Sequence, residues 1–301
     1  MPLEIRPVVG HEDLQRWVAT RNAASSDAIT VEMRALVRAL EIDSVDLIAE
    51  HDGEAVGMAF LSGDPRSLEI RRPWFDVRVP AEHRERGVGS ALLTEIVDRA
   101  RRAGHVGLRC SAHAEDSASL AFLDRRGFSV TRSIEQVSLE LDPLPVVQSQ
   151  TPDGIRLLRL TDTPELLPAM YALAVSTAAD RTDKLGAVVP TEADWRTYEL
   201  SIPFVRLEMT AVATAEGEVV GYSVIQDLPG RAALLHRSLV VAPTWRGRGL
   251  AQTLVTAAIR DAAAAGVPRL IAIPESQFEA EVFGSLGYAL CDRWLEHDRA
   301  L

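Results

Sequence analysis

Four short sequence features occur twice in this 301-residue chain, in the same order and at nearly the same spacing. Arg84-Glu85-Arg86-Gly87-Val88-Gly89 matches Arg246-Gly247-Arg248-Gly249-Leu250-Ala251, and the two segments begin 162 positions apart (246 − 84). The other pairs are Gly53–Gly57 with Gly217–Gly221, Gly104 with Gly266, and Gly127-Phe128 with Gly287-Tyr288. This period far exceeds the roughly 20–50 residues of a solenoid repeat, so each copy is expected to be a whole domain.

The seam between the copies is rich in proline, polar residues and glycine. It runs from Asp142-Pro143-Leu144-Pro145 to Thr151-Pro152-Asp153-Gly154, a composition typical of a linker. We therefore expect an N-terminal domain at residues 1–142, a linker at 143–154 and a C-terminal domain at 155–301. Each domain is long enough to bury a hydrophobic core of its own.

Both halves predict the same order of helices and strands. The expected helices, from their apolar periodicity, are Glu12–Ala24 and Val31–Leu40, then Glu165–Ala179 and Glu192–Ser201. The expected strands are Val45–Glu50, Ala55–Leu61 and Phe75–Val79, then Met209–Ala213, Val219–Ile225 and Leu235–Val241. An amphipathic helix follows each repeated Arg–Gly segment. Helices interleaved with strands and hairpins indicate an α/β fold with a mixed sheet.

Charge and cysteine content exclude several classes of function. The net charge of −11 argues against nucleic-acid binding, which needs a basic face. The two cysteines, Cys110 and Cys291, provide neither a disulfide framework nor metal-ligand spacing, so no metal is expected. The first residues lack a signal-peptide pattern, and no apolar run approaches the ~18 residues of a membrane span. We expect a cytoplasmic monomer or homodimer without a membrane partner.

The repeated segment has the chemistry of an anion-binding turn. Gly87 and Gly249 allow backbone conformations that other residues avoid, and the small Gly89 and Ala251 let an anion approach the main chain. Backbone N–H groups and the positive end of the following helix then favour a pyrophosphate. The expected pyrophosphate-binding residues are Arg84, Glu85, Arg86, Gly87, Gly89 and Ser90, and Arg246, Gly247, Arg248, Gly249, Ala251 and Gln252. The segment is neither a Walker A loop nor a dinucleotide fingerprint, because the glycine spacing differs.

These segments resemble the signature of the GCN5-related N-acetyltransferase (GNAT) superfamily. That signature is Arg/Gln-x-x-Gly-x-Gly/Ala at the start of a helix, followed later by Gly-Phe/Tyr, and both halves carry it, as in tandem proteins of the actinobacterial type. The resemblance implies two GNAT-like domains, each a mixed central sheet flanked by helices. It also implies transfer of an acetyl group from acetyl-CoA to a primary amine of a small molecule or peptide. The pantetheine arm would pair with Val77 to Val79 and with Leu239 to Val241.

The chain departs from this family at the tyrosine that protonates the leaving thiolate of CoA. Leu123 and Phe283 occupy that position, and Asp116 and Ser276 occupy the position of the preceding asparagine. A thiolate is a good leaving group, so an acid is less necessary than for an amine. The departure leaves two alternatives open: a non-catalytic acyl-CoA-binding or sensing protein, or a chain in which only one half is active with a larger acyl-CoA.

The acceptor amine must lose a proton, and three residues are candidates for the base. His236 stands at the start of the central strand of the second half, whereas Glu69 and Asp76 are the acidic candidates of the first half. Strand alternation places His236 on the face opposite Leu239 unless a bulge intervenes. An ordinary hydrogen-bonded histidine and solvated carboxylates explain these residues as well.

The acceptor is expected near two variable segments, Ala24–Leu40 and Ala178–Phe204. The aromatic and acidic residues of the second segment are Trp195, Tyr198, Asp180, Asp183, Glu192 and Asp194. Such carboxylates suit a cationic amine, and a solvated helix face accounts for them equally well. The fuller arginine–glycine loop and His236 favour the second half as the catalytic one.

Overall fold

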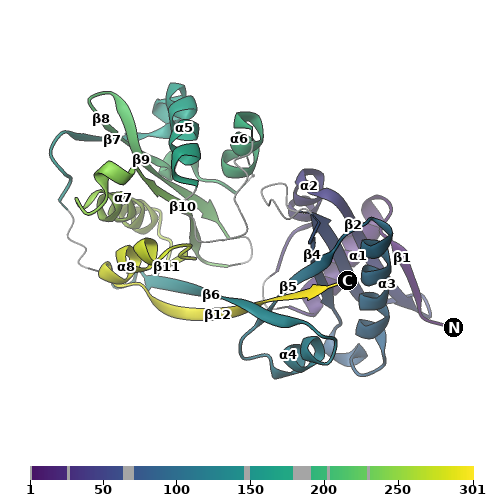
Figure 1. Ribbon diagram of the computed structural model, residues 1–301. Helices are drawn as coiled ribbons and strands as arrows, with labels where there is room; N and C mark the ends of the chain where they lie inside the picture. The colour runs from purple at the N-terminus through teal and green to yellow at the C-terminus, as the bar shows by residue number, and fades with distance from the viewer. Residues whose placement is uncertain are drawn as a thin grey trace. The chain divides into compact units, whose positions relative to one another are not determined.

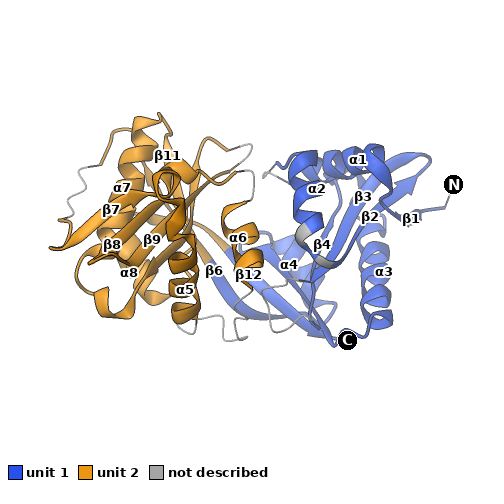
Figure 2. Ribbon diagram, turned by 90° about the horizontal axis from the view of Figure 1, so that it is seen from above, with its two compact units in different colours: residues 1–134, 294–301 blue, residues 135–293 orange. Residues whose placement is uncertain are grey.

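The chain forms two compact units. The computed structural model describes residues 2–25, 28–63, 71–145, 150–178, 191–201, 204–228 and 231–301. Residues 1–134 together with 294–301 make up unit 1, and residues 135–293 make up unit 2 (Figure 2). None of the helices in these described ranges is long and apolar enough to cross a membrane.

Unit 1 is a mixed sheet with helices on both faces (Figure 1). Its strands are ordered β1-β2-β3-β4-β5-β12, and β4 and β5 are parallel whereas the other neighbours are antiparallel. Its elements are β1 (Glu4–Pro7), α1 (Gly10–Ala23), α2 (Val31–Leu40), β2 (Ile42–His51), β3 (Glu54–Gly63), β4 (Trp74–Arg78), α3 (Val88–Arg102), β5 (Gly107–His113), α4 (Ser117–Asp124) and the first part of β6 (Ser129–Glu140).

Unit 2 repeats this arrangement. Its strands are ordered β6-β11-β10-β9-β8-β7, and only β10 and β11 are parallel among the pairs of known register. Its elements are β7 (Ile155–Arg159), α5 (Leu167–Thr177), α6 (Glu192–Leu200), β8 (Ala211–Ala215), β9 (Glu218–Asp227), β10 (Leu234–Val241), α7 (Leu250–Ala264), β11 (Arg269–Ala272), α8 (Gln277–Ser285) and the first part of β12 (Ala289–Ala300). The predicted α/β class with a mixed sheet in each half is confirmed.

One expected strand boundary was wrong. Met209 was expected to begin a strand, but it ends a short 3-10 helix, Leu207–Met209, and the strand begins at Ala211. The apolar side chain of Met209 is nevertheless buried in the core of unit 2, so the apolar pattern alone could not distinguish the two conformations.

Two long strands each contribute to both units. Strand β6 starts in unit 1, and its residues Val137–Glu140 pair with β11 in unit 2. Strand β12 starts in unit 2, and its residues Trp294–Ala300 pair with β5 in unit 1. Each half of the sequence therefore supplies one strand to the sheet of the other half. The packing units consequently cross the expected linear boundaries at residues 142 and 155.

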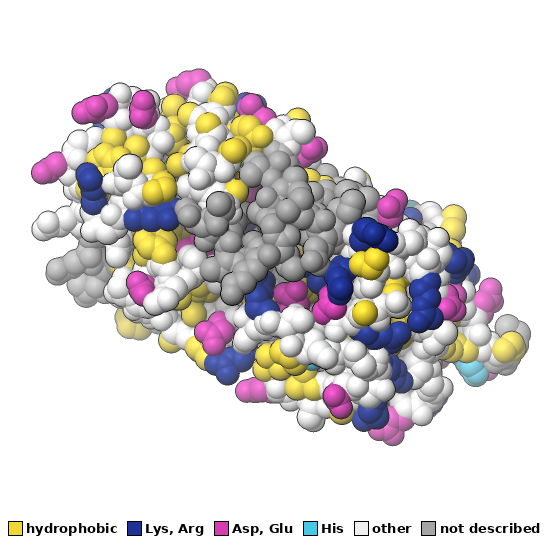
Figure 3. Space-filling model, viewed as in Figure 1, with side chains coloured by type: hydrophobic (Ala, Val, Ile, Leu, Met, Phe, Trp, Pro, Cys, Tyr) yellow, Lys and Arg dark blue, Asp and Glu magenta, His cyan; other side chains and the backbone are white. Residues whose placement is uncertain are grey.

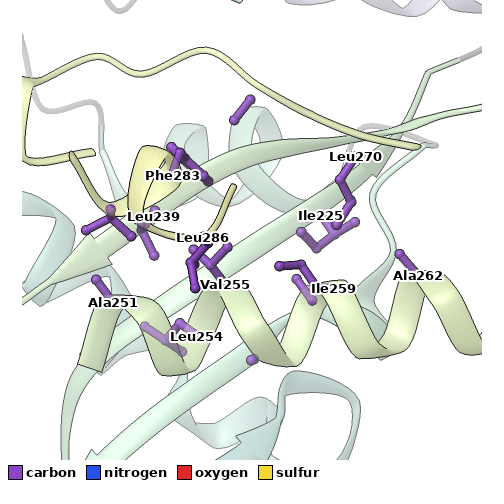
Figure 4. Packing of buried hydrophobic residues seen from close by; sticks show 14 of the residues in the cluster. Ile225, Leu239, Ala251, Leu254, Val255, Ile259, Ala262, Leu270, Phe283 and Leu286 are labelled. Atoms are coloured by element: carbon purple, nitrogen blue, oxygen red, sulfur yellow. The ribbon is translucent and has the colours of Figure 1, made fainter. Parts of the chain in front are cut away.

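The two faces of the unit 2 sheet pack against different helices. On one face, α7 and α8 cover Leu239 and Val241 of β10, and Figure 4 shows the apolar side of α7 turned toward the strands. On the other face, α5 and α6 cover Val240 of β10 together with Tyr222 of β9. Successive residues of β10 therefore alternate between an α7 face and an α6 face.

Unit 1 has the same two faces. Helix α3 packs on Phe75 and Val77 of β4, and α1 packs on Met58 and Phe60 of β3. Arg34 of α2 lies on the α1 face, 4% exposed, with its guanidinium 5.2 Å from the Trp17 ring and 4.9 Å from the Phe60 ring.

The repeated glycines Gly57 and Gly221 lie where α3 and α7 cross the sheet. A Cβ atom at Gly57 would lie 2.8 Å from Val88 Cγ1, and one at Gly221 would lie 3.0 Å from the Val240 carbonyl oxygen. The Cβ atom at Gly221 would also lie 3.1 Å from Leu254 Cδ1 of α7. These contacts are shorter than van der Waals distance, so the start of each helix can lie this close to its strand because the glycine has no side chain.

We expect Gly221→Ala to destabilise unit 2 by about 1–3 kcal/mol, because the added methyl group meets a backbone oxygen that cannot move away cheaply. Gly284→Ala is the matched control: this glycine lies inside α8 with nothing within 4 Å of the added Cβ, so the change should stabilise by about 0.5–1 kcal/mol. Denaturant titration of both variants tests the pair, and equal effects would contradict it.

Candidate active site

The central strand of unit 2 has one open edge. Strand β10 is paired with β11 only at Leu234, Leu235 and His236, and β11 ends at Ala272. From Ser238 to Val241 the same strand remains paired with β9 on its other side. In the part of unit 2 that the structure describes, the two parallel strands thus separate after His236, and the edge of residues 238–241 is open to an extended ligand.

Unit 1 has the same opening. Within its described residues, the register of β4 with β5 is confined to Trp74 opposite Arg109, whereas Trp74–Arg78 are paired with β3. Val77 lies on this stretch and Val79 just beyond it, as Leu239 and Val241 lie on β10. Their side chains pack toward α3 and α7, so their main chain is what the open edge presents.

The helix that follows each central strand begins without a side-chain cap. Gly87 and Gly249 are the N-cap residues of α3 and α7, with φ angles of 84° and 85°, and in the described part of the chain neither helix has a side-chain cap at this position. Neither first turn contains an acidic residue. By contrast, Thr30, Thr191 and Ser276 cap their helices through side-chain oxygens. The N–H groups of α3 and α7 therefore remain suited to an external anion.

The repeated arginines connect the loop to the central strand. Arg84 Nε donates to the Val79 carbonyl at 3.0 Å, and Arg246 Nε donates to the Val241 carbonyl at 3.2 Å. The residue after each arginine has a positive φ, 63° at Glu85 and 70° at Gly247. The loop conformation is therefore the same in both units, although one copy has a glutamate where the other has a glycine.

The remaining loop residues differ between the units. Arg86 is exposed, and Arg248 lies 5.2 Å from the Trp245 ring. Gly89 leaves room beside Phe122 and Val79, whereas Ala251 is buried in the core. Gln252 is half-buried in the first turn of α7.

One residue near the unit 1 loop was missed by the sequence analysis. Arg126 Nη2 donates to Ser90 Oγ at 2.5 Å, and its guanidinium carbon lies 3.6 Å from the centre of the Phe122 ring. Burial, with a smaller contribution from Arg125, lowers its pKa. Its position directly before the repeated Gly127-Phe128 was the available signal. This arginine adds a positive charge beside the first turn of α3.

A carboxylate lies beside each open strand, but it comes from a different element in each unit. In unit 1 it is Asp76 of β4, which accepts a hydrogen bond from Arg78 Nε at 2.6 Å. In unit 2 the residue that matches Asp76 in the repeat, 162 positions later, is Ser238 of β10. The carboxylate there is Glu199 of α6, which accepts a hydrogen bond from Ser238 Oγ. Glu199 has no local sequence signal, because its partner Ser238 is 39 positions away.

His236 lies on the α7 face of β10. The register with β9 shifts between His236 and Ser238, so the bulge that alternation required is present. Its ring packs 5.3 Å from Phe283 and 6.1 Å from Tyr288, and Nε2 is buried without a partner among the described residues. Burial lowers the pKa of His236 to about 3, which makes the ring a weak base. Its catalytic role remains a prediction, and this burial counts against it.

The positions of the missing tyrosine are part of the apolar core in both units. Leu123 of α4 and Phe283 of α8 are 6% and 2% exposed and pack in the hydrophobic cores of units 1 and 2. Asp116 and Ser276, at the asparagine position, cap those helices through bonds of 3.0 and 3.2 Å from the Ser119 and Glu279 N–H groups. These side chains therefore have structural roles, and neither Leu123 nor Phe283 can protonate a leaving group.

The residues expected at the acceptor site, and the candidate base Glu69, differ in how the structure places them. Trp195 is buried against Tyr171 and Tyr222, with ring centres 5.8 and 6.4 Å away. Glu192 pairs with Arg196 one turn along α6, and Asp194 accepts from the capping Thr191 hydroxyl, so helix contacts account for both. The Tyr198 carbonyl accepts a hydrogen bond from Arg237 Nη2 at 2.6 Å. Glu69, Asp180 and Asp183 lie outside the described residues.

Charged side chains of both signs occur among uncharged ones on the face shown in Figure 3. The whole chain has 43 acidic and 32 basic residues.

Two solved structures share this architecture over nearly the whole chain. One is a tandem GNAT protein from the clavulanic acid biosynthesis pathway, with a TM-score of 0.80 and 18% identity over 99% of this chain and 98% of that one. The other is a GCN5-related N-acetyltransferase from Sphaerobacter thermophilus, with a TM-score of 0.74 and 20% identity over 99% and 95% of the two chains. At these identities the likeness shows the fold.

A curated relative matches part of the chain. The L-methionine sulfoximine/L-methionine sulfone acetyltransferase of Salmonella typhimurium is 31% identical over 96 residues, which are 31% of this chain and 56% of that protein. The match thus spans about half the length of the relative.

The family model described as "Acetyltransferase (GNAT) family" matches residues 14–128 and again residues 175–288. These two matches contain the uncapped helices α3 and α7 and both open strands. The chain therefore belongs to the acetyltransferase (GNAT) family and carries the domain twice.

Proposed function

We propose that this chain transfers an acetyl group from acetyl-CoA to a primary amine of a small molecule or peptide. The observation that carries the proposal occurs in both units: an uncapped helix N-terminus follows directly after a strand with one open edge. A pyrophosphate fits the first feature, and an extended amide-containing arm fits the second.

In this proposal the residues of the loops and strands bind and orient the cosubstrate. The first N–H groups of α3 and α7 would hold the pyrophosphate, with Arg84 and Arg246 keeping each loop attached to its strand. The main chain of Val77–Val79 and of Leu239–Val241 would pair with the pantetheine arm. Acetyl-CoA supplies an activated acyl group, so the protein needs to position the amine and accept its proton.

We favour unit 2 as the catalytic half. Its strand β10 carries a bulge at the end of the open edge, and a carboxylate from α6 contacts that strand. In unit 1 the corresponding carboxylate, Asp76, is bound to the neighbouring Arg78. A larger acyl group remains an alternative that competition between acyl-CoA species of increasing chain length would test.

A second candidate function is non-catalytic binding or sensing of an acyl-CoA. The apolar side chains of Leu123 and Phe283 favour it, because neither unit has the tyrosine acid of the family pattern. Tight binding of acetyl-CoA without turnover on any amine would support this function over catalysis.

The similar proteins suggest the first amines to assay. We would use L-methionine sulfone, which the name of the Salmonella relative includes, and glucosamine, because a fungal region titled a glucosamine N-acetyltransferase has a TM-score of 0.74 to this chain. Spermidine and a short peptide would represent polyamines and protein N-termini.

Acetyl-CoA binding should fall about tenfold or more at the unit 2 site in Gln252→Glu, because a carboxylate in the first turn of α7 repels the pyrophosphate. The same change favours the helix, by about 0.3–1 kcal/mol, because a negative charge suits a helix N-terminus. Lost binding would therefore not reflect lost folding. Calorimetry of wild type and variant measures the affinity and the number of sites.

Ser90→Glu makes the corresponding test in unit 1, and Ser90→Gln is its neutral control, with the residue that unit 2 has naturally. Two sites, each weakened by its own glutamate, would support two cofactor-competent units. One site would identify the unit to pursue. Absence of acetyl-CoA binding by the wild-type chain would contradict the proposed function.

A further inference from the structure

The open edge of β10 ends at a defined point. If the pyrophosphate lies at the start of α7, the pantetheine arm runs back along β10 from Val241 toward its beginning. The strand is closed again at His236, which is paired with Ala272. Residues 238–241 span about 13 Å at roughly 3.3 Å per residue, so the thioester end of the arm would lie beside Ser238.

Glu199 is the carboxylate at this point. Ser238 is 7% exposed and its Oγ donates to Glu199 Oε1, while the side chain of Glu199 is 13% exposed. Among the described residues, Glu199 forms one ion pair, with Arg237, whose Nε lies 3.7 Å from Glu199 Oε2. Arg237 is itself held by the Gln226 side chain at 2.9 Å and by the Tyr198 carbonyl.

The two repeats show why a carboxylate from α6 matters. Asp76 of unit 1 lies on the α1 face of β4, opposite Phe60 in the register, and Ser238 occupies the matching position of unit 2. In unit 2 the strand has a serine instead of a carboxylate at this position, and α6 places Glu199 against that serine. Both units therefore have a carboxylate at the same point of the central strand. In unit 1 the strand itself supplies it, and in unit 2 helix α6 supplies it.

We propose that Glu199 is the residue of unit 2 that contacts the acceptor nitrogen and takes its proton, with Ser238 as the residue that positions it. This assignment rests on the acetyl transfer proposed above. His236 is a poorer candidate because it lies on the opposite, α7 face among Phe283 and Tyr288. Glu192 and Asp194 of the same helix bind Arg196 and Thr191 instead.

The atoms and electrons of the proposed acetyl transfer balance with the amine, acetyl-CoA and Glu199. The lone pair of the neutral amine forms the C–N bond to the acetyl carbonyl carbon, and the C–S bond breaks. The electron pair of that bond leaves with the CoA thiolate. The proton that the nitrogen must lose passes to a Glu199 oxygen, and from there to solvent or to the thiolate. A hydrogen bond from Ser238 fixes Oε1 of Glu199, and Oε2, which lies 3.7 Å from Arg237 Nε, is the oxygen that would take the proton.

The test compares three variants of the full chain: Glu199→Gln, Ser238→Ala and Glu192→Gln. CoA release is followed by chromatography with each amine of the panel and with water as the only acceptor. We expect Glu199→Gln to lower kcat about 10²-fold while the calorimetric affinity for acetyl-CoA stays within about twofold. Ser238→Ala should have a smaller effect in the same direction. Glu192→Gln, an equal chemical change on the same helix, should leave kcat unchanged.

Chemical rescue separates a proton acceptor from a structural partner of Arg237. In Glu199→Ala, added formate should restore part of kcat, whereas a purely structural carboxylate would not give a rate that rises with formate. A Glu199→Gln variant with kcat within threefold of wild type, or Glu199→Ala without rescue, overturns the assignment and leaves acetyl transfer intact. A wild-type chain that binds acetyl-CoA but releases no CoA with any acceptor overturns both.

Discussion

Replacing Asp46 with alanine should destabilise unit 1 by about 3 kcal/mol, because it leaves the buried guanidinium of Arg34 without its main partner. Asp46 is 1% exposed and Arg34 is 4% exposed. Arg34 Nε donates to both Asp46 oxygens at 3.1 and 3.2 Å, and its Nη2 donates to Oδ1 at 2.5 Å. Glu41 also binds Arg34, at 3.0 Å, which keeps the expected loss at the lower end for a broken buried pair.

The double variant Arg34→Met with Asp46→Ala should be more stable than Asp46→Ala alone. The double variant removes the buried guanidinium that Asp46→Ala leaves without its main partner, and the methionine can fill the space between Trp17 and Phe60. Glu41 loses its ion pair with Arg34, which makes the expected gain smaller. The exposed pair Arg269–Glu140 is the control, and Glu140→Ala should cost less than about 1 kcal/mol. Denaturant unfolding measures all three. An Asp46→Ala variant as stable as Glu140→Ala would mean that water compensates Arg34.

His236→Leu should remove much of the acid sensitivity of unit 2. Burial lowers the pKa of His236 to about 3, against about 6.5 in an unfolded chain. Between these values the unfolded state binds a proton that the folded state does not, so folding becomes less favourable as the pH falls from 6.5. At 1.36 kcal/mol per pH unit, the loss by pH 4.5 is roughly 3 kcal/mol.

At pH 7 the same substitution should change stability by less than about 1 kcal/mol, because leucine has a similar volume and the ring loses little hydrogen bonding. Nε2 has no partner among the described residues, and Nδ1 has only a long contact of 3.5 Å with Ser223 Oγ. The measurement is the free energy of unfolding of wild type and variant at pH 7 and pH 4.5. The two proteins should differ at pH 4.5 and agree at pH 7. Equal losses in both would show that His236 takes up its proton in the folded state.

The loops of the site could be predicted from sequence because local chemistry determines them. A turn that needs positive φ at Gly87 and Gly249 selects glycine at fixed spacing, and the repeat doubled this signal. The alternation of apolar residues likewise identified β4 and β10, with their side chains on two faces. The predicted fold class was confirmed for the same reason.

Other parts of the site depend on contacts between distant residues. The bulge at His236 moves its side chain to the α7 face, and strict alternation would have placed it on the other. Glu199 reaches Ser238 only because α6 packs on the face of β10 that carries Val240. Neither the bulge nor the packing of α6 has a local sequence signal, so both remained hidden until the fold was known.

The exchange of β6 and β12 was equally hidden, because an apolar strand pattern does not specify which sheet the strand joins. Both strands have the same length of 12 residues and follow matching helices, α4 and α8. The alternation of side chains along either strand is compatible with pairing to β5 or to β11. The structure shows which sheet each strand joins: Trp294–Ala300 of β12 pair with β5, and Val137–Glu140 of β6 pair with β11.

This exchange also determines when the sheet of unit 1 can be completed during translation. Strand β12 is translated after the other elements of both units, yet its residues Trp294–Ala300 complete the sheet of the unit whose other strands are translated first. Until then β5 has an unpaired edge, which is a site for aggregation with other nascent chains. We therefore expect the sheet of the first unit to be completed only after the second unit has been synthesised.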